Sequence, residues 1–467
     1  MWSRRAWGRA AIGLGTALVS VLTTAAVAVD RRADDVDDES GDLTVEVIDA
    51  ETGAALAARV MLATRGLFGA TRALTAGDGT LHTRLPAGAH QLTVTHGPEW
   101  SVHGRRVELP PGGQLRVRAL LSRLVDAAEY TACDLHVHTD GSPDSSVTLA
   151  RRIASLRAED VQFAVLTDHN RVTAASTALA EAGIGTLPGV EITSWAPEFG
   201  HFNAFPRGSA PRYAGTSARA LLRELRRDPD VFVQINHPRL EHHIGYFALA
   251  GLDRAGARVD EAKFPLAFDA VEVWNGYDLG APARRDEVFH DWLALLARGL
   301  HVGATGGSDA HRDDAPPYVG YPRTYVHVPR ARAREPNLVL RALKQGRAFV
   351  SNGPIVTLSA RGHGPGDVLR PGPREHHLVV HVDVQAPAWM QLDEVAIWAG
   401  DRRVATRALP MEVERGATRH RLALTIPIGR ARSLVATVRG AADMRPLVAR
   451  GGVTPFAFTN PLWIAAR

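Results

Sequence analysis

The sequence predicts an α/β barrel between two β-rich domains, and three observations support this fold class. Apolar and polar residues alternate with period two in residues 43–125 and again in residues 356–467, which is typical of half-buried strands. Between these segments, short apolar runs alternate with amphipathic helical patterns, which indicates parallel strands joined by crossover helices. A chain of 467 residues, of which 45% are hydrophobic and 22% are charged, is long enough for several globular domains.

Residues 1–28 have the pattern of an export signal. A basic start precedes a stretch without charge, and the small residues at 26–28 suit cleavage by a signal peptidase. The adjacent Arg4 and Arg5 resemble a twin-arginine signal, with a generic basic start as the alternative. A retained membrane anchor is the other alternative, because about 20 uncharged residues suffice to span a bilayer. We expect a secreted or periplasmic protein with no stable membrane insertion after cleavage.

The next two segments are a charged linker, residues 29–42, and a predicted β-sandwich, residues 43–125. Leu43, Val45 and Val47 alternate with polar residues, and turn-forming residues separate several runs of this kind. A domain of this length is typical of a β-sandwich. The segment resembles the carboxypeptidase-regulatory-like modules of exported enzymes, and we find no catalytic constellation in it.

The predicted barrel, residues 128–355, is built from short apolar runs and amphipathic helices. Five of the runs have the length of buried strands: 163–166, 186–192, 231–235, 270–274 and 301–305. A helical pattern begins behind Thr216, a suitable N-cap, and a second amphipathic helix ends at Gly299. Residues 356–467 return to period two, and we expect a second β-rich domain there.

Charge and cysteine content exclude several classes of function. The net charge is only +4, and the basic residues, nearly all arginine, are scattered among acidic ones, so we expect no nucleic-acid partner. The single cysteine, Cys133, excludes an intrachain disulfide and a thiolate-rich zinc cluster. The 20 histidines are the unusual feature of the composition.

Several of these histidines lie where apolar strands end or begin. His136 and His138 are two residues apart on a predicted strand, so both side chains point to the same face. Other chemically active residues recur at further strand ends: Asp168, His169, Glu191, His201, His237, Asp309 and His311. In a βα barrel such ends converge on one face. Imidazoles and carboxylates crowded there need a counter-charge, and bound cations supply one.

Seven motifs carry a family resemblance: DLHVHTDGSPDS (134–145), FAVLTDHN (163–170), PGVEIT (188–193), GHFNAFP (200–206), INHPR (235–239), VEVWNG (271–276) and GGSDAH (306–311). Through them, residues 130–355 resemble a polymerase and histidinol phosphatase (PHP) domain. With VSNGP (350–354) and FTNPLW (458–463), the chain resembles the carbaryl-hydrolase-like CehA/McbA branch of PHP metallohydrolases. The resemblance implies a distorted (βα)7 barrel with seven parallel strands that holds two or three divalent ions.

Carried over position by position, the resemblance implies a set of metal ligands: His136, His138, His169, Glu191, His201, His237, Asp309 and His311. Glu191 is expected to bridge two ions. The family's ninth ligand, an acid, usually follows the second histidine of the first motif by five residues, where this chain has Pro143. We therefore assign Asp144, with Asp140 as the alternative ligand and an N-cap as the alternative role. This donor set suits Zn, Mn or Fe.

The candidate catalytic residues are His237, Arg239 and Asp168. Asp168 and Asp134 precede ligand histidines and are expected to orient them. Arg239 is a candidate for the rim that faces the substrate, with a structural role as the alternative. The other candidates for this rim are Asn275, Tyr246, His242 and His243.

The expected function is that of an exported metal-dependent hydrolase with a small-molecule substrate. A metal-activated hydroxide would attack the scissile bond. The branch resemblance implies an ester or carbamate bond, whereas the wider superfamily makes a phosphoesterase the alternative. The non-enzyme alternative is a metal-dependent extracytoplasmic binding protein whose β domains hold a surface polymer.

Overall fold

The structure, a computed structural model, describes residues 40–466 except 65–70, 195–197, 241–243 and 256. The predicted export signal and most of the predicted linker lie outside the described residues. In the part of the chain that is described, no helix has both the length and the apolar character needed to cross a membrane.

The N-terminal part is a β-sandwich of two sheets, with strand orders β4-β1-β7 and β3-β2-β5-β6. Its strands are β1 (Ser40–Asp49), β2 (Ala58–Thr64), β3 (Thr71–Ala76), β4 (Thr80–Pro86), β5 (Gly88–Thr95), β6 (His103–Leu109) and β7 (Gln114–Leu121). The alternating residues Leu43, Val45 and Val47 are buried and pack with Leu92 and Val94 of the opposite sheet. Strand β1 begins at Ser40, so the end of the predicted linker belongs to this sandwich.

The middle of the chain contributes strands to two further sheets. They are β8 (Thr131–Val137), β9 (Phe163–Leu166), β10 (Gly185–Thr186), β11 (Val190–Thr193), β12 (His201–Phe205), β13 (Phe232–Ile235), β14 (Ala270–Asn275), β15 (Gly303–Gly307), β16 (Arg323–Val326) and β17 (Ala348–Ser351). Strands β8, β9 and β10 are parallel, as are β13, β14 and β15. Isolated parallel bridges, Val137 to Ala310 and His169 to Glu191, join the two sheets into a curled surface.

A barrel of seven parallel strands is not confirmed. Strand β12 pairs antiparallel with both β11 and β13. For β11 and β12, the connection from Thr193 to His201 is too short for the crossover that a parallel pair needs. The run predicted as one strand over residues 186–192 is divided into β10 and β11. Pro188 lies in the gap and has no backbone N–H for the ladder.

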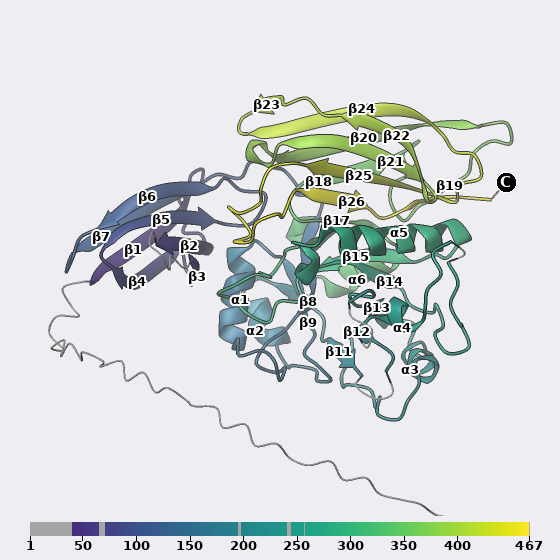
Figure 1. The fold of residues 1–467 in the computed structure, drawn as a ribbon, viewed down its shortest axis with the longest axis horizontal. Helices are drawn as coiled ribbons and strands as arrows, with labels where there is room; N and C mark the ends of the chain where they lie inside the picture. The colour runs from purple at the N-terminus through teal and green to yellow at the C-terminus, as the bar shows by residue number, and fades with distance from the viewer. Residues whose placement is uncertain (1–39, 65–70, 195–197, 241–243, 256, 467) are drawn as a thin grey trace, which may run out of the picture.

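Helices cover the outside of the curled sheets (Figure 1). They are α1 (Leu149–Ala158), α2 (Ser176–Glu181), α3 (Ala218–Leu225), α4 (Tyr246–Leu249), α5 (Pro282–Arg298) and α6 (Pro336–Lys344), with short 3-10 turns at Gly276–Asp278, Arg330–Arg332 and Ala388–Met390. The N-cap of α3 is Ser217, whose hydroxyl accepts from the Ala220 N–H, and not the predicted Thr216. Helix α5 ends as predicted at Gly299, which has a φ of 97°.

The C-terminal part is rich in β structure and is continuous with the middle. Its strands are β18 (Ile355–Ser359), β19 (Val368–Leu369), β20 (His377–Pro387), β21 (Leu392–Ala399), β22 (Arg402–Ala408), β23 (Val413–Glu414), β24 (Ala417–Pro427), β25 (Ser433–Gly440), β26 (Phe456–Thr459) and β27 (Leu462–Ile464). Strand β26 pairs with β17, so one eleven-stranded sheet contains both β8 and β21. Hydrogen bonding therefore crosses the predicted domain boundary at residue 355, and that boundary stays a prediction.

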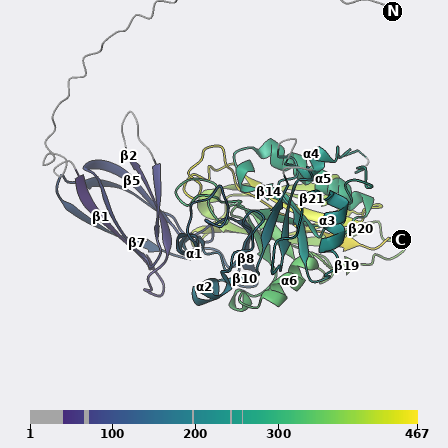
Figure 2. The same cartoon turned by 90° about the horizontal axis from the view of Figure 1, so that it is seen from below.

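The N-terminal sandwich lies beside α1 at one side of the curled sheets, in both views (Figures 1 and 2). A buried carboxylate joins the two parts. Glu99, between β5 and β6, accepts from Arg123 at 2.6 Å, from Arg330 at 2.5 Å and from the Tyr325 hydroxyl at 3.3 Å. Asp160 also accepts from both arginines, and we call these five residues the junction network.

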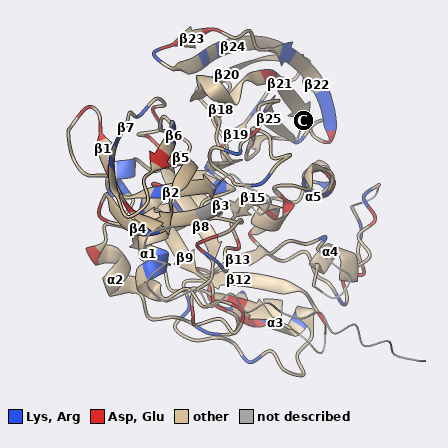
Figure 3. Cartoon of the chain, turned by 60° about the vertical axis from the view of Figure 1, so that its left-hand side comes forward, with Lys and Arg blue, Asp and Glu red and all other residues tan. Residues whose placement is uncertain are grey.

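Basic and acidic residues are interspersed along the ribbon (Figure 3). The curled sheets, the sandwich and the C-terminal strands all carry both signs of charge. The absence of a nucleic-acid partner stays a prediction.

Candidate metal centre

The eight ligands that the resemblance implies converge at one end of the curled sheets. They form four overlapping groups in which the ligand atoms all lie within 4.8 Å of one another. The groups are His138, His169 and His311; His136, Glu191 and His237; His136, His138 and Asp309; and His169, Glu191 and His201. Six imidazoles and two carboxylates from separate strand ends thus meet at one place, which we call the histidine cluster.

The backbone brings the strand ends unusually close together. A Cβ on Gly307, at the end of β15, would lie 2.7 Å from the Cβ of His136 and 2.8 Å from Oε1 of Glu272, so only glycine fits there. His237 and Asp309 follow β13 and β15 with φ values of 27° and 53°. These left-handed conformations are costly for residues other than glycine, and they persist at sites that surrounding contacts hold in place.

Glu191 lies at the centre of the histidine cluster and is fully buried. Its Oε1 lies 3.1 Å from Nδ1 of His201 and accepts from Nδ2 of Asn236 at 2.9 Å. Its Oε2 lies 2.9 Å from Nδ1 of His169. The Nε2 atoms of His136 and His237 are each 3.4 Å from Oε1. A carboxylate with both oxygens among imidazoles has the placement that a bridging ligand needs.

Asp309 and Asp144 each lie close to two further imidazole nitrogens of the cluster. Oδ1 of Asp309 is 3.2 Å from Nε2 of His136 and 3.0 Å from Nε2 of His138. Oδ2 of Asp144 is 3.2 Å from Nε2 of His169 and 3.1 Å from Nε2 of His311. Because Asp144 is half-exposed, it marks the side of the histidine cluster that faces solvent, which we call the mouth.

The two alternatives for the ninth ligand now differ in position. Within the described ranges, the side chain of Asp140 makes no hydrogen bond or ion pair with the cluster residues, and its backbone N–H donates to the carbonyl of Val147. The N-cap of α1 is Thr148, so Asp144 does not cap that helix. The structure therefore brings Asp144 to the cluster and leaves Asp140 outside it.

Sequence reasoning missed Glu272, which holds two of the predicted ligands. Its Oε1 lies 2.9 Å from Nδ1 of His136, and its Oε2 accepts from the backbone N–H of His237 at 2.9 Å and from Asn275 at 3.0 Å. Thr193 and Ser142, also missed, lie 2.6 Å and 2.9 Å from the Nδ1 atoms of His169 and His138. A carboxylate inside the apolar run 270–274 was the available signal for Glu272.

Asp168 and Asp134 contact backbone and hydroxyl groups rather than imidazole rings, contrary to expectation. Asp168 accepts from the N–H and the hydroxyl of Thr139, both at 2.7 Å, and from Thr173. Asp134 accepts from the backbone N–H groups of His136, Ser308 and Gly320. These carboxylates satisfy buried backbone donors in the loops that carry the ligands, so they position loops and not rings.

The structure does not bring Arg239 to the cluster. Its Nε donates to the buried Asp291 on α5 at 2.7 Å and its Nη2 donates to the carbonyl of Leu252 at 3.2 Å. Tyr246 is also turned away, since it is fully buried and donates to the carbonyl of Pro265. Asn275 does reach the cluster, because its Nδ2 donates to Oδ2 of Asp309 at 3.2 Å. The candidates His242 and His243 lie outside the described residues.

Tyr277 lies at the mouth and was also missed. Its hydroxyl is 3.5 Å from Nδ1 of His311, and 42% of the residue is exposed. Partial burial, with the negative charges of Asp309 and Asp144, raises the pKa of Tyr277 to about 12, so its hydroxyl stays protonated at neutral pH.

The carboxylates hold protons on some of the imidazoles. Burial lowers the pKa of His169, but the charges of Glu191 and Asp144 outweigh burial and raise it to about 10. Burial dominates at His138 and lowers its pKa to about 4. Burial raises the pKa of Glu191, but the neighbouring imidazoles more than offset this and hold it well below its usual range. The cluster thus binds positive charge strongly.

Unsatisfied nitrogen and oxygen atoms show that the cluster fits metal ions. Within the described residues, the following buried atoms have no well-directed hydrogen bond, although several lie within 3.5 Å of another cluster atom: Nε2 of His136, His138, His201 and His311, Nδ1 of His237, and Oε2 of Glu191. Buried polar atoms without partners are rare, and an ion is one of the explanations for them. Imidazole and carboxylate donors without thiolate suit Zn, Mn or Fe.

Arg152 of α1 links two of the ligand segments. Its buried guanidinium donates to the carbonyls of His138 at 2.8 Å, Ala310 at 2.9 Å and Arg312 at 3.2 Å. One side chain therefore holds the segment that ends in His138 against the segment that carries Asp309 and His311.

Arg152→Met is expected to lower metal affinity by about 10–100-fold, the usual effect of removing a group that orients ligands. The three carbonyls would lose their common donor, and the two segments could separate. Metal titration against the purified variant measures the effect, and circular dichroism checks that it is folded. Arg157→Met, at an exposed position of the same helix, is the control. Unchanged affinity in Arg152→Met would contradict this role.

No protein-family model matches the chain, and no curated protein matches it. Several solved structures align with it at low similarity. A two-domain protein from Bacteroides vulgatus ATCC 8482, described as containing a predicted PHP-like metal-dependent phosphoesterase, is 14% identical over 72% of this chain and 97% of its own, with a TM-score of 0.34. An amidohydrolase from Chromobacterium violaceum is 20% identical over 40% of this chain and 89% of its own, with a TM-score of 0.27.

A third alignment involves a minor pilin of Streptococcus agalactiae, which is 13% identical over 19% of this chain and 46% of its own, with a TM-score of 0.16. Because all three TM-scores are below 0.5, these likenesses carry no conclusion about function.

Proposed function

We propose that the chain is a PHP-type metal-dependent hydrolase whose histidine cluster holds two or three ions of Zn, Mn or Fe. The convergence of six imidazoles with Glu191 and Asp309 carries this proposal. If the cluster never bound ions, its buried nitrogens would stay unpaired and its carboxylates crowded, which would lower the free energy of unfolding. Divalent ions bound there would supply Lewis acidity for hydrolysis.

The protein groups around the cluster have separate tasks in this proposal. Glu272, Thr193 and Ser142 fix the orientation of three imidazoles through their Nδ1 atoms. Asp144 is the proposed ninth ligand, and Tyr277 beside His311 at the mouth can contact a substrate. The Tyr277 hydroxyl is a donor at neutral pH and can hold a leaving group by a hydrogen bond.

We propose an ester or carbamate as the scissile bond, with a phosphoester as the alternative. The likeness of the motifs to the carbaryl-hydrolase-like branch supports the ester or carbamate. The wider PHP superfamily, in which phosphoesterases predominate, is the reason for the alternative.

Elemental analysis and a substrate panel test the proposal together. Two or three equivalents of metal, with chelator-sensitive cleavage of aryl esters or carbamates, is the expected result. Exclusive release of phosphate from phosphomonoesters would select the alternative bond. Metal-loaded protein that cleaves none of the three classes would favour the non-enzyme alternative, a binding protein. Export through residues 1–28 is a separate proposal, tested by N-terminal sequencing of secreted protein.

Metal affinity is expected to rise with pH between about 7 and 9. A cation that binds at His169 displaces a proton held with a pKa of about 10, so affinity rises about tenfold per pH unit for each proton released. The proton on His169 stabilises the metal-free fold at neutral pH, and this contribution is lost as the pH rises through about 10. Calorimetric titration with Zn in two buffers of different ionisation enthalpy counts the protons. A count of zero at pH 8 would contradict the expectation.

A further inference from the structure

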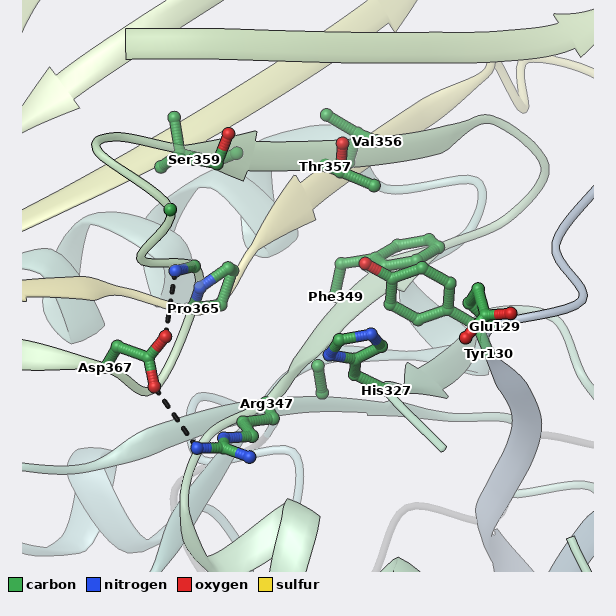
Figure 4. A pocket seen from close by; sticks show the side chains of 14 residues that line it. Glu129, Tyr130, His327, Arg347, Phe349, Val356, Thr357, Ser359, Pro365 and Asp367 are labelled. Atoms are coloured by element: carbon green, nitrogen blue, oxygen red, sulfur yellow. Dashed lines mark hydrogen bonds and ion pairs between the residues drawn. The ribbon is translucent and has the colours of Figure 1, made fainter. Parts of the chain in front are cut away.

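Two adjoining cavities lie at the far end of β8 from the histidine cluster. Their volumes are about 420 and 400 Å³, and both are lined by Glu129, Tyr130 and Thr357. Tyr130 precedes the first residue of β8, whereas His136 lies near its last. Residues 126–130, which connect the sandwich to β8 and are distinct from the charged linker of residues 29–42, form one wall of these cavities. We therefore call the two cavities together the linker groove. Figure 4 shows the first cavity.

A fixed set of aromatic rings lines the groove. The ring of Tyr130 stacks on His327 with centroids 5.0 Å apart and meets the edge of Phe349 at 5.1 Å. Phe349 is itself stacked on Tyr325 at 4.7 Å. Rings held this way lose little conformational freedom when a ligand packs against them, which favours binding of a ligand with an apolar face.

Several polar groups of the groove are free to bind a ligand. The hydroxyls of Tyr130, Thr357 and Ser359 make no hydrogen bond within the described residues. On the opposite wall in Figure 4, Arg347 pairs with Asp367 at 3.2 Å. A ligand rich in hydroxyl groups can satisfy these donors and acceptors, whereas an apolar ligand would leave them buried and unpaired.

The charges of the groove disfavour an anionic ligand. Its carboxylates and guanidinium groups nearly balance: Asp126, Glu129, Asp367 and Asp383 against Arg347, Arg419 and Arg421. Asp367 pairs with Arg347, Arg421 lies 3.8 Å from Asp383, and Arg419 donates to the carbonyl of Leu124. Arg421 is largely exposed, but with four carboxylates against three guanidinium groups the groove has no excess of positive charge to attract a phosphate or sulfate.

We infer that the linker groove binds a neutral oligosaccharide, with a sugar ring against the Tyr130 and His327 wall and sugar hydroxyls bonded to Thr357, Ser359 and Glu129. Apolar rings combined with a few polar groups, at the contact of different parts of a chain, are typical of a small-molecule site. Two cavities that share a wall match a ligand of at least two sugar units. The site is separate from the histidine cluster and does not depend on the proposed hydrolase.

Calorimetric titration of the full chain with maltohexaose, cellohexaose, chitohexaose and xylohexaose tests the inference. At least one probe is expected to bind, and Tyr130→Ala and Thr357→Val are each expected to weaken its binding by about tenfold, equivalent to about 1.4 kcal/mol. Thr357→Val keeps the volume of the side chain, so it stays informative if Tyr130→Ala fails to fold. Thr406→Val, at an exposed position of β22, is the matched control and should bind as the unmodified chain does.

Three results would overturn the inference: no binding of any probe, binding that neither variant weakens, or binding of a sulfated oligosaccharide in preference to all four neutral ones. His138→Ala distinguishes this site from the metal centre. That variant is expected to lose metal and keep the binding of the oligosaccharide.

Discussion

Glutamine in place of Glu191 is expected to lower hydrolysis by more than about 10³-fold and to reduce the bound metal to one equivalent or none. Removing a residue that only orients a metal ligand lowers metal affinity or activity by about 10–100-fold. The effect of Glu191 should be larger because its carboxylate lies within 3.5 Å of five imidazoles and is itself a proposed ligand. Glutamine keeps the shape of the side chain but removes the charge that holds cations at the centre. Elemental analysis and turnover of the best substrate measure the two effects.

A second measurement separates this electrostatic role from simple misfolding. In the metal-free protein the charge of Glu191 raises the pKa of His169, so the Glu191→Gln variant should show a lower His169 pKa in an NMR titration. Glu335→Gln, which changes an exposed partner of Arg332, is the matched control and should leave metal content and turnover unchanged. Full metal content in Glu191→Gln would rule out its role as a ligand.

Glu99→Ala is expected to lower the free energy of unfolding by about 3 kcal/mol, at the lower end of the range for breaking a buried ion pair. Its side chain is 2% exposed and faces Arg123 and Arg330, which retain 31% and 21% exposure. Those arginines would lose the more buried of their two shared partners and keep Asp160, while water can reach part of each. The denaturant midpoint, followed by tryptophan fluorescence, measures the loss.

The junction network lies outside the histidine cluster, so the Glu99→Ala variant should keep its metal content while folded. Glu335→Ala breaks an exposed ion pair and is expected to cost less than about 1 kcal/mol. Equal midpoints for the two variants would show that the network does not hold the sandwich against the curled sheets.

The histidine cluster could be predicted because its members have local signals. His169, His237 and Asp309 each follow a short apolar run, and such runs place their ends on one face of a sheet. Glu272 escaped notice because its position inside an apolar run says that it is buried but not which residue it faces. Its contact with His136 joins residues 136 positions apart, and no local pattern encodes that distance.

Other differences have equally specific causes. Asp168 and Asp134 were expected to contact histidine rings, but they accept from backbone N–H groups of neighbouring turns. Tertiary packing decides which N–H groups approach these carboxylates, so no local pattern predicts the contacts. The antiparallel direction of β12 follows from a short connection that could have been counted. The pairing of β17 with β26 has no such signal, because period two shows that a strand exists and not where its partner lies.

That pairing has a consequence for biosynthesis. Strand β17 ends at Ser351 and its partner β26 begins at Phe456, so a ribosome must add the whole intervening segment first. At about 5–20 residues per second, this takes roughly 5–20 s. During that interval the growing chain carries an open edge that can template pairing with a neighbouring chain. We therefore expect nascent chains of this protein to be most prone to pair with one another at β17 until β26 has been made.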